Sequence, residues 1–299
     1  MASVKTEERH DKARGLDAMH PALALRLLAA GQQAAAKVVD AAIEPISAAA
    51  RIAAGCLSAG GRLAYAGAGS SGLMAMADAL ELPGTYGITL DKVVVLLAGG
   101  AASLADLAGG YEDDMDLARR DVQQAGIGAG DCLIAVSASG STPYALAALD
   151  EARKSGARVV ALANNPGAVL FQDADVAILL QTPPEVVSGS TRMGAGTAQK
   201  IALNMFSTLV GIHLGHVHDG HMVNLKADNA KLRARAVRIV ADIAEVGDAE
   251  AGRYLTMSSG SVKIAILLAA GASDVAAAEA ALADAEQNLR RALSRVAAH

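Results

Sequence analysis

Short apolar runs alternate with longer stretches of helical spacing over the first two thirds of the chain. Residues 20–58 are rich in Ala and Leu with apolar positions at helical intervals, which predicts one or two leading helices. Five apolar runs with the length of strands follow. These predicted strands are Arg62–Ala66, Lys92–Leu97, Cys132–Val136, Arg158–Ala163 and Val176–Leu180. The clearest predicted helices after them are Ser71–Leu82, Pro143–Lys154 and Ala195–Leu214.

Strands separated by helices imply right-handed crossovers and a parallel sheet covered by helices on both faces. The expected fold class is therefore α/β, with three layers around a central parallel sheet. Residues 226–299 lack strand signals and read as helices with breaks near Gly247, Gly260 and Gly271. We therefore expect a main domain over residues 1–225 and a small helical domain over residues 226–299.

Composition and charge narrow the possible partners. The 299 residues are 53% hydrophobic and 2% aromatic, and the net charge is −5. An acidic chain argues against nucleic acid, which needs a basic face, but a local positive site could still bind one anionic metabolite.

Several features predict a soluble cytoplasmic protein. Cys56 and Cys132 lie far apart without CxxC spacing, so a disulfide is not expected. Residues 1–14 are charged and lack the apolar core of a signal peptide. The most apolar stretch, residues 93–107, is too short to span a bilayer, which needs about 20 apolar residues.

The first candidate site is the segment GAGSSG at residues 67–72, between a predicted strand and a predicted helix. Its spacing fits G-x-G-x-x-G, but the second strand ends Leu96-Leu97-Ala98-Gly99-Gly100, without the acid that a dinucleotide site places there. The segment also lacks the GK[ST] of a P-loop. We select Gly69, Ser70 and Ser71 as phosphate-binding candidates.

The second candidate site, SASGSTP at residues 137–143, repeats the arrangement after another strand. Hydroxyls and free N–H groups at a helix N-terminus form a site for a compact phosphate. The hydroxyls could instead be helix caps only. Two serine-rich loops at one edge of a sheet favour a ligand site. The candidates here are Ser137, Ser139, Ser141 and Thr142.

A third hydroxyl-rich segment, residues 188–200, opens the long helix after the last strand. It adds Ser190, Thr191, Arg192 and Lys200 as phosphate-binding candidates. The alternative is a capped helix start with small residues for close packing.

At these residues the sequence resembles the SIS (sugar isomerase) phosphosugar-binding domain, and more narrowly the N-acetylmuramic acid 6-phosphate etherases. The resemblance covers nearly the full length. The matching segments are Thr6-Glu7 with Leu16-Asp17, GAGSSG at 67–72, DALELPGTYG at 78–87, LAGG at 97–100, GGYEDD at 109–114, SASGSTPY at 137–144, PPEVVSGSTRMGAGTAQK at 183–200 with Asn204, Lys226 with Asn229 and Lys231, and GSVKIAILLAAG at 260–271.

The resemblance implies removal of the D-lactyl ether from N-acetylmuramate 6-phosphate by a homodimer, with the site near the subunit interface and no metal or organic cofactor. By motif position it implies Glu81 and Glu112 as the catalytic pair, with Glu81 assisting lactate departure and Glu112 handling the C2 proton. Paired carboxyls with separated pKa values suit such acid–base work. Without the resemblance, Glu81 would be a helix-end charge and Glu112 an exposed acid in an acidic run.

The sequence departs from the family pattern at several positions, two of which remove a positive charge. Leu73 and Gly194 stand where the family usually has Arg and Lys, so two cations near the anionic ligand are missing. A related phosphosugar with another 3-substituent is therefore an open alternative. Further departures are Leu82, Gly84 and the absence of a proline in residues 225–229.

Four histidines fall within nine residues: His213, His216, His218 and His221. Their spacing fits no metal motif such as HExxH, and a solvated helix end explains them more simply. A further hypothesis is that one of these histidines reaches the substrate site of the other subunit in a dimer.

Two other functional classes stay open. A non-catalytic phosphosugar sensor would bind through the same loops, although such regulators are usually longer. A phosphosugar aldose–ketose isomerase would use the same C2 proton without eliminating a substituent.

Overall fold

The computed structural model describes residues 5–104 and 109–297. The chain packs as two compact units, one formed by Met1–Leu80 with Asp91–Ser207 and the other by Glu81–Leu90 with Thr208–His299. Each unit is described separately below.

The first unit is built on a five-stranded parallel sheet of order β2-β1-β3-β4-β5. The strands are β1 (Leu63–Gly67), β2 (Val93–Leu97), β3 (Cys132–Ser137), β4 (Arg158–Ala163) and β5 (Val176–Leu179). The central strands β1 and β3 are buried along their whole length, as expected for a parallel sheet covered on both faces. The predicted fold class is confirmed.

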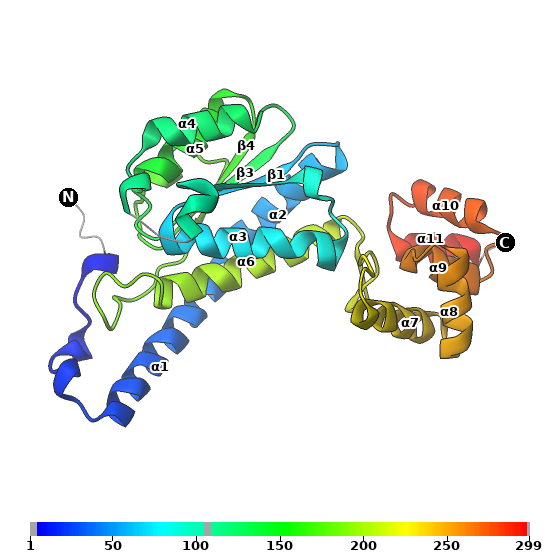
Figure 1. The fold of residues 1–299 in the computed structure, drawn as a ribbon, viewed down its shortest axis with the longest axis horizontal. Helices are drawn as coiled ribbons and strands as arrows, with labels where there is room; N and C mark the ends of the chain where they lie inside the picture. Colours follow the sequence, from blue (N-terminus) through cyan, green and yellow to red (C-terminus); the bar gives the residue numbers. More distant parts are fainter. Residues whose placement is uncertain (1–4, 105–108, 298–299) are drawn as a thin grey trace. The chain divides into compact units, whose positions relative to one another are not determined.

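Helices cover the two faces of this sheet (Figure 1). The α-helices that begin in the first unit are α1 (Pro21–Lys37), α2 (Ile43–Ser58), α3 (Gly69–Tyr86), α4 (Met115–Gln124), α5 (Pro143–Lys154) and α6 (Gly194–His213). On one face α4 and α5 enclose a hydrophobic core that includes Ala66, Leu133 and Tyr144. The alanines let these helices approach the sheet closely.

Short 3-10 turns connect many of these elements. They are Lys5–Glu7, Asp11–Ala13, Leu16–Ala18, Val38–Ala42, Leu90–Lys92, Gly100–Leu104, Gly109–Tyr111 and Val169–Phe171.

The strand order reverses direction between β1 and β3. The first crossover leaves β1 for β2 on one side, and later crossovers add β3, β4 and β5 on the other. Open α/β sheets bind ligands at such a switch point, beyond the carboxyl ends of the strands. The register pairs Gly67 with Val136, so the loops that follow these two strands begin side by side.

The second unit contains helices around its own aliphatic core, in which Ile239, Leu255 and Leu267 are buried. Its elements are β6 (Val217–His218), β7 (His221–Met222), α7 (Ala230–Ala244), α8 (Asp248–Met257), α9 (Val262–Ala269), α10 (Val275–Asp284) and α11 (Leu289–Val296). The hairpin of β6 and β7 was not predicted from the sequence. Asp219 and Gly220 connect its strands with φ of 44° and 81°, the positive values of a tight hairpin turn.

Within the described ranges, no helix combines the length and apolarity required to cross a bilayer.

Candidate active site

The two serine-rich loops leave adjacent strands at the switch point of the sheet. Residues 67–72 follow β1 and open α3, while residues 137–143 follow β3 and open α5. The structure thus brings the loop that carries Gly69, Ser70 and Ser71 next to the loop that carries Ser137, Ser139, Ser141 and Thr142.

The hydroxyls of the second loop hold one another in place. Ser137 Oγ lies 2.8 Å from Thr142 Oγ1 and accepts a 3.0 Å hydrogen bond from the N–H of Gly140. Ser139 Oγ accepts from the N–H of Ser141 at 3.2 Å and from its hydroxyl at 3.1 Å. Thr142 is the N-cap residue of α5, yet its side chain makes no capping hydrogen bond. Simple helix capping therefore does not account for Thr142.

Gly140 is required by the shape of this loop. Its φ of +71° lies in the left-handed region, and a Cβ there would collide with Ala168.

Glu112 lies between the two serine loops. A Cβ added to Gly69 would be 2.5 Å from Glu112 Oε1, so the carboxylate rests against the first loop. The Glu112 carbonyl accepts a 2.9 Å hydrogen bond from the N–H of Tyr144, in the first turn of α5. The side chain is half-buried, and burial, followed by the charge of Asp113, raises its pKa above the ordinary glutamate value.

Glu81 lies on α3, twelve residues beyond Gly69, and is exposed. Twelve residues of α-helix rise about 18 Å. Glu81 is therefore well removed along α3 from the glycine that Glu112 contacts.

One turn before Glu81, the buried carboxylate of Asp78 joins α3 to the sheet and to α6. It accepts hydrogen bonds from Tyr65 at 2.9 Å, Asn204 at 2.7 Å and Ser207 at 2.9 Å. Burial raises the pKa of Asp78, and these hydrogen bonds oppose the rise. Asp78 was not selected from the sequence, although its place in the DALE segment, three residues before Glu81, was a usable signal.

The third predicted segment is arranged differently. The N–H groups of Gly194 and Ala195, at the start of α6, donate to the buried Glu185 carboxylate at 2.9 and 2.8 Å. This carboxylate already satisfies the amides that would otherwise attract an anion. Arg192 and Lys200 are exposed, and Ser190 and Thr191 are half-buried. Among the described residues, no hydrogen bond joins residues 190–192 to either serine loop.

Gly194 itself sits in a confined position. A Cβ there would lie 3.1 Å from both the Ala35 Cβ and the Glu185 carboxylate. The tight packing at this point suits glycine and leaves little space for the lysine that the family pattern has.

Asn165 is a second neighbour of the site that the sequence did not reveal. Its side chain donates to the Ala138 carbonyl of the second serine loop at 3.0 Å and to Thr6 Oγ1 at 3.1 Å. The N–H of Thr6 returns a hydrogen bond to Asn165 Oδ1 at 3.3 Å. Asn165 therefore ties the N-terminal segment to the backbone of this loop.

Two histidines of the second unit pair with different acids. His218 lies 3.5 Å from Asp219, and His221 Nε2 lies 2.6 Å from Asp242 Oδ2. Burial lowers the pKa of His216 to about 4. Over residues 5–104 and 109–297, no group of three or more His, Cys, Asp or Glu is placed to hold a metal ion.

The parallel sheet with paired serine loops at its switch point defines a SIS-type α/β protein, and residues 28–164 match the family model of the SIS domain. A phosphoheptose isomerase from Francisella tularensis aligns with a TM-score of 0.49 and 21% identity, covering 65% of this chain and 98% of that one.

Two relatives identify the narrower family within the proteins that carry a SIS domain. An N-acetylmuramic acid 6-phosphate etherase from Deinococcus radiodurans is 44% identical over 265 residues, covering 88% of this chain and 87% of the relative. A protein of the same name from Geobacillus thermodenitrificans is 39% identical over 290 residues, covering 97% and 98%. The chain belongs to the N-acetylmuramic acid 6-phosphate etherase family, as its sequence motifs predicted.

Proposed function

We propose that the protein is a carbon–oxygen lyase that converts N-acetylmuramic acid 6-phosphate and water to N-acetylglucosamine 6-phosphate and D-lactate. The names of its relatives support this substrate. The observation that carries the proposal is the half-buried Glu112 carboxyl held against Gly69 between two hydroxyl-rich loops.

The two loops are proposed to bind the 6-phosphate. Their donors are the backbone of Gly69 with the hydroxyls of Ser70 and Ser71, and the hydroxyls of the second loop. The second-loop residues are Ser137, Ser139, Ser141 and Thr142. A helix begins directly after each loop, and both helix dipoles favour an anion there. Ser190, Thr191, Arg192 and Lys200 are proposed to contribute from the third segment.

Glu112 is proposed as the base. In the open-chain sugar, the C1 aldehyde acidifies the C2 proton, and a Glu112 oxygen accepts that proton. The electron pair of the C2–H bond forms a C2=C3 double bond while the C3–O bond breaks. A raised carboxyl pKa suits this role, because a stronger base removes a carbon-bound proton more readily.

Glu81 is proposed as the acid that protonates the departing lactate oxygen. Water then adds to the double bond, placing OH at C3 and H at C2, which yields the product sugar. Because about 18 Å of α3 separates Gly69 from Glu81, we propose that the Glu81 of a second copy serves this site in a homodimer. The exposure of Glu81 supports this arrangement.

We further propose a cytoplasmic protein with no nucleic-acid partner. Cys56 and Cys132 are both free thiols, as is usual in a reducing compartment. The net charge of −5 gives no basic footprint for a nucleic-acid backbone.

The direct test is incubation of the purified protein with N-acetylmuramic acid 6-phosphate, with D-lactate measured enzymatically. Release of lactate that is lost in both Glu81→Gln and Glu112→Gln, with sugar-phosphate binding retained, supports the proposal. Binding without any conversion would favour the sensor, and conversion of an aldose phosphate to a ketose phosphate without lactate would favour the isomerase.

A further inference from the structure

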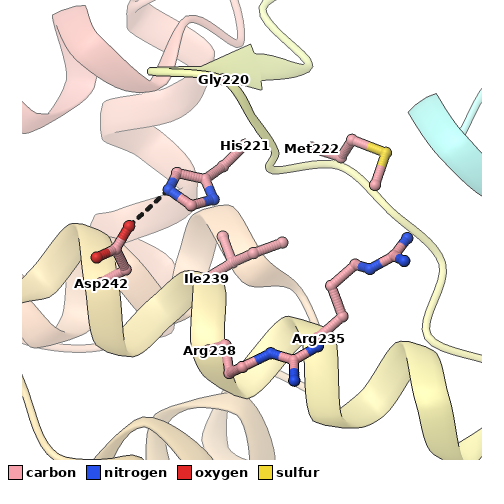
Figure 2. Close-up of a pocket in the computed structure, with 7 residues that line it drawn as sticks. All are labelled: Gly220, His221, Met222, Arg235, Arg238, Ile239 and Asp242. Carbon is pink, nitrogen blue, oxygen red and sulfur yellow. Dashed lines mark hydrogen bonds and ion pairs between the residues drawn. The ribbon is translucent and has the colours of Figure 1, made fainter.

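A separate cavity of about 480 Å³ lies in the second unit, between the β6–β7 hairpin and α7 (Figure 2). Its size falls in the range of small-ligand pockets. Its lining residues are Gly220, His221, Met222, Arg235, Arg238, Ile239 and Asp242. None of them belongs to the serine loops or to the proposed catalytic pair.

Positively charged side chains outnumber negatively charged ones around this cavity. Lys231, Arg235, Arg238 and Asp242 recur at intervals of four, three and four residues, which places them on one face of α7. Asp242 is the only acid lining the cavity, and His221 lies 2.6 Å from it. Within residues 5–104 and 109–297, Arg235 and Arg238 have neither an ion pair nor a side-chain hydrogen bond.

Two unpaired guanidinium groups three residues apart on a helix repel each other. A bound anion would remove this repulsion and give each planar fork an acceptor, since arginine matches phosphate with two parallel hydrogen bonds. Figure 2 shows the Arg235 side chain extending from α7 toward the strand that carries Met222, while the His221 ring turns toward Asp242.

The remaining residues that line the cavity are apolar or lack a side chain. Ile239 is buried and Met222 half-buried, and Gly220 adds no side chain at the hairpin turn. The cavity therefore offers a concentrated positive charge beside an apolar surface, as ligand sites commonly do.

We propose that this cavity is a second anion site that binds a phosphate group through Arg235 and Arg238, either as inorganic phosphate or as a phosphate monoester of a small sugar. It is distinct from the serine loops, and its existence does not depend on the proposed etherase reaction.

The test uses the full-length protein labelled with ¹³C at its methionine methyl groups. Met222→Leu assigns the Met222 signal, which reports on the cavity and not on the serine loops. Inorganic phosphate and N-acetylglucosamine 6-phosphate are titrated separately at constant ionic strength, with chloride as the reference anion. We expect a saturable shift of the Met222 signal. The compound that binds with the lower dissociation constant shows whether the cavity prefers inorganic phosphate or a sugar phosphate.

The matched variants lie on one helix. The double variant Arg235→Gln with Arg238→Gln removes both guanidinium groups. It should weaken phosphate binding at the cavity by about tenfold or more, since each lost hydrogen bond involves a charged donor. Arg233→Gln removes one positive charge from the same helix but from a residue outside this cavity, so it matches the single variant Arg238→Gln in charge. It should leave the Met222 titration within about twofold, because an exposed charge acts weakly at a distance.

Arg238 is exposed, so Arg238→Gln alone keeps the test available if the double variant fails to fold. A Met222 signal that no phosphate compound moves overturns the proposal. A titration unchanged in the arginine variants, or weakened equally in Arg233→Gln, overturns it as well. Lactate release is assayed independently, so loss of the etherase proposal would leave this result intact.

Discussion

The Glu112 carboxylate and the backbone of Gly69 are in such close contact that a Cβ at residue 69 would stand 2.5 Å from Oε1. The two residues are far apart in sequence, one at the start of α3 and the other just before α4. The contact places a carboxyl of raised pKa beside the end of β1, where the two serine loops leave adjacent strands.

Gly69→Ala is expected to disable the site more than it destabilises the fold. The new methyl group would displace the Glu112 carboxylate, and a misplacement of about 1 Å in a catalytic group costs about 100-fold in rate. The φ of +51° adds strain, which should lower the free energy of unfolding by about 1–2 kcal/mol. Lactate release and thermal unfolding would be measured together.

Gly84→Ala is the matched control for that change. Gly84 lies on the same helix, and a Cβ there meets no atom within 4 Å. Its activity should stay close to that of the unaltered protein. Equal activity in the two alanine variants would mean that the Gly69–Glu112 contact plays no part in catalysis.

The acidic limb of the pH–rate profile should report the Glu112 carboxyl. Activity as a base requires its deprotonated form, so a raised pKa moves the loss of activity to higher pH than an ordinary glutamate would give. Asp113→Asn removes a neighbouring negative charge that contributes to the rise. We therefore expect the limb of kcat/KM to move to lower pH in this variant.

Asp116→Asn provides the comparison, since Asp116 is an exposed acid of the same run that pairs with Arg119. It should leave the limb in place. A limb that moves equally in both variants would indicate a general charge effect, and one that moves in neither would assign the titration to a different group.

The sheet was predictable because its strands are short, continuously apolar and separated by strong helical periods. The predicted strands Cys132–Val136 and Arg158–Ala163 agree with the structure to within one residue. The helix that begins at the first serine loop continues past the predicted end at Leu82 and through Pro83 to Tyr86. A proline ordinarily marks a helix end, so local rules stop this helix too early.

Other features depend on contacts that no local pattern reveals. The start of α6 is capped by the carboxylate of Glu185, nine residues earlier in the chain. Local sequence rules look for a hydroxyl cap next to the helix start and so miss this contact. The Asp219-Gly220 pair is a known hairpin signal, but two-residue strands leave no alternation to accompany it. Gly69 follows β1 and Glu112 lies in the connection between β2 and α4, so their proximity depends on the tertiary fold and not on a local sequence pattern.

Homodimer catalysis is tested by mixing two inactive variants. Glu81→Gln and Glu112→Gln should each lose lactate release as homodimers, because each site would lack one group. After joint denaturation and refolding, random pairing gives heterodimers in which one of the two sites has both glutamates. About a quarter of the unaltered activity should return if each site combines two copies.

The control mixes Glu112→Gln with a Glu81→Gln, Glu112→Gln double variant, which cannot assemble an intact site. Size-exclusion chromatography before mixing checks that each variant forms a dimer. No recovered activity in verified heterodimers would show that Glu81 and Glu112 act within one copy.

The low pKa of His216 predicts a loss of stability in mild acid. Folding favours the neutral ring, because burial lowers its pKa from 6.5 to about 4, so the unfolded chain binds more protons between those values. The contribution of His216 to the free energy of unfolding is present above pH 6.5 and declines as the pH falls toward 4, by up to about 3 kcal/mol.

In urea unfolding, the stability of His216→Asn should show a shallower decline over this pH window than that of the unaltered protein. His213→Asn, which changes an exposed histidine at the end of α6, should retain the full slope. Identical slopes in all three proteins would mean that His216 is protonated equally in the folded and unfolded states.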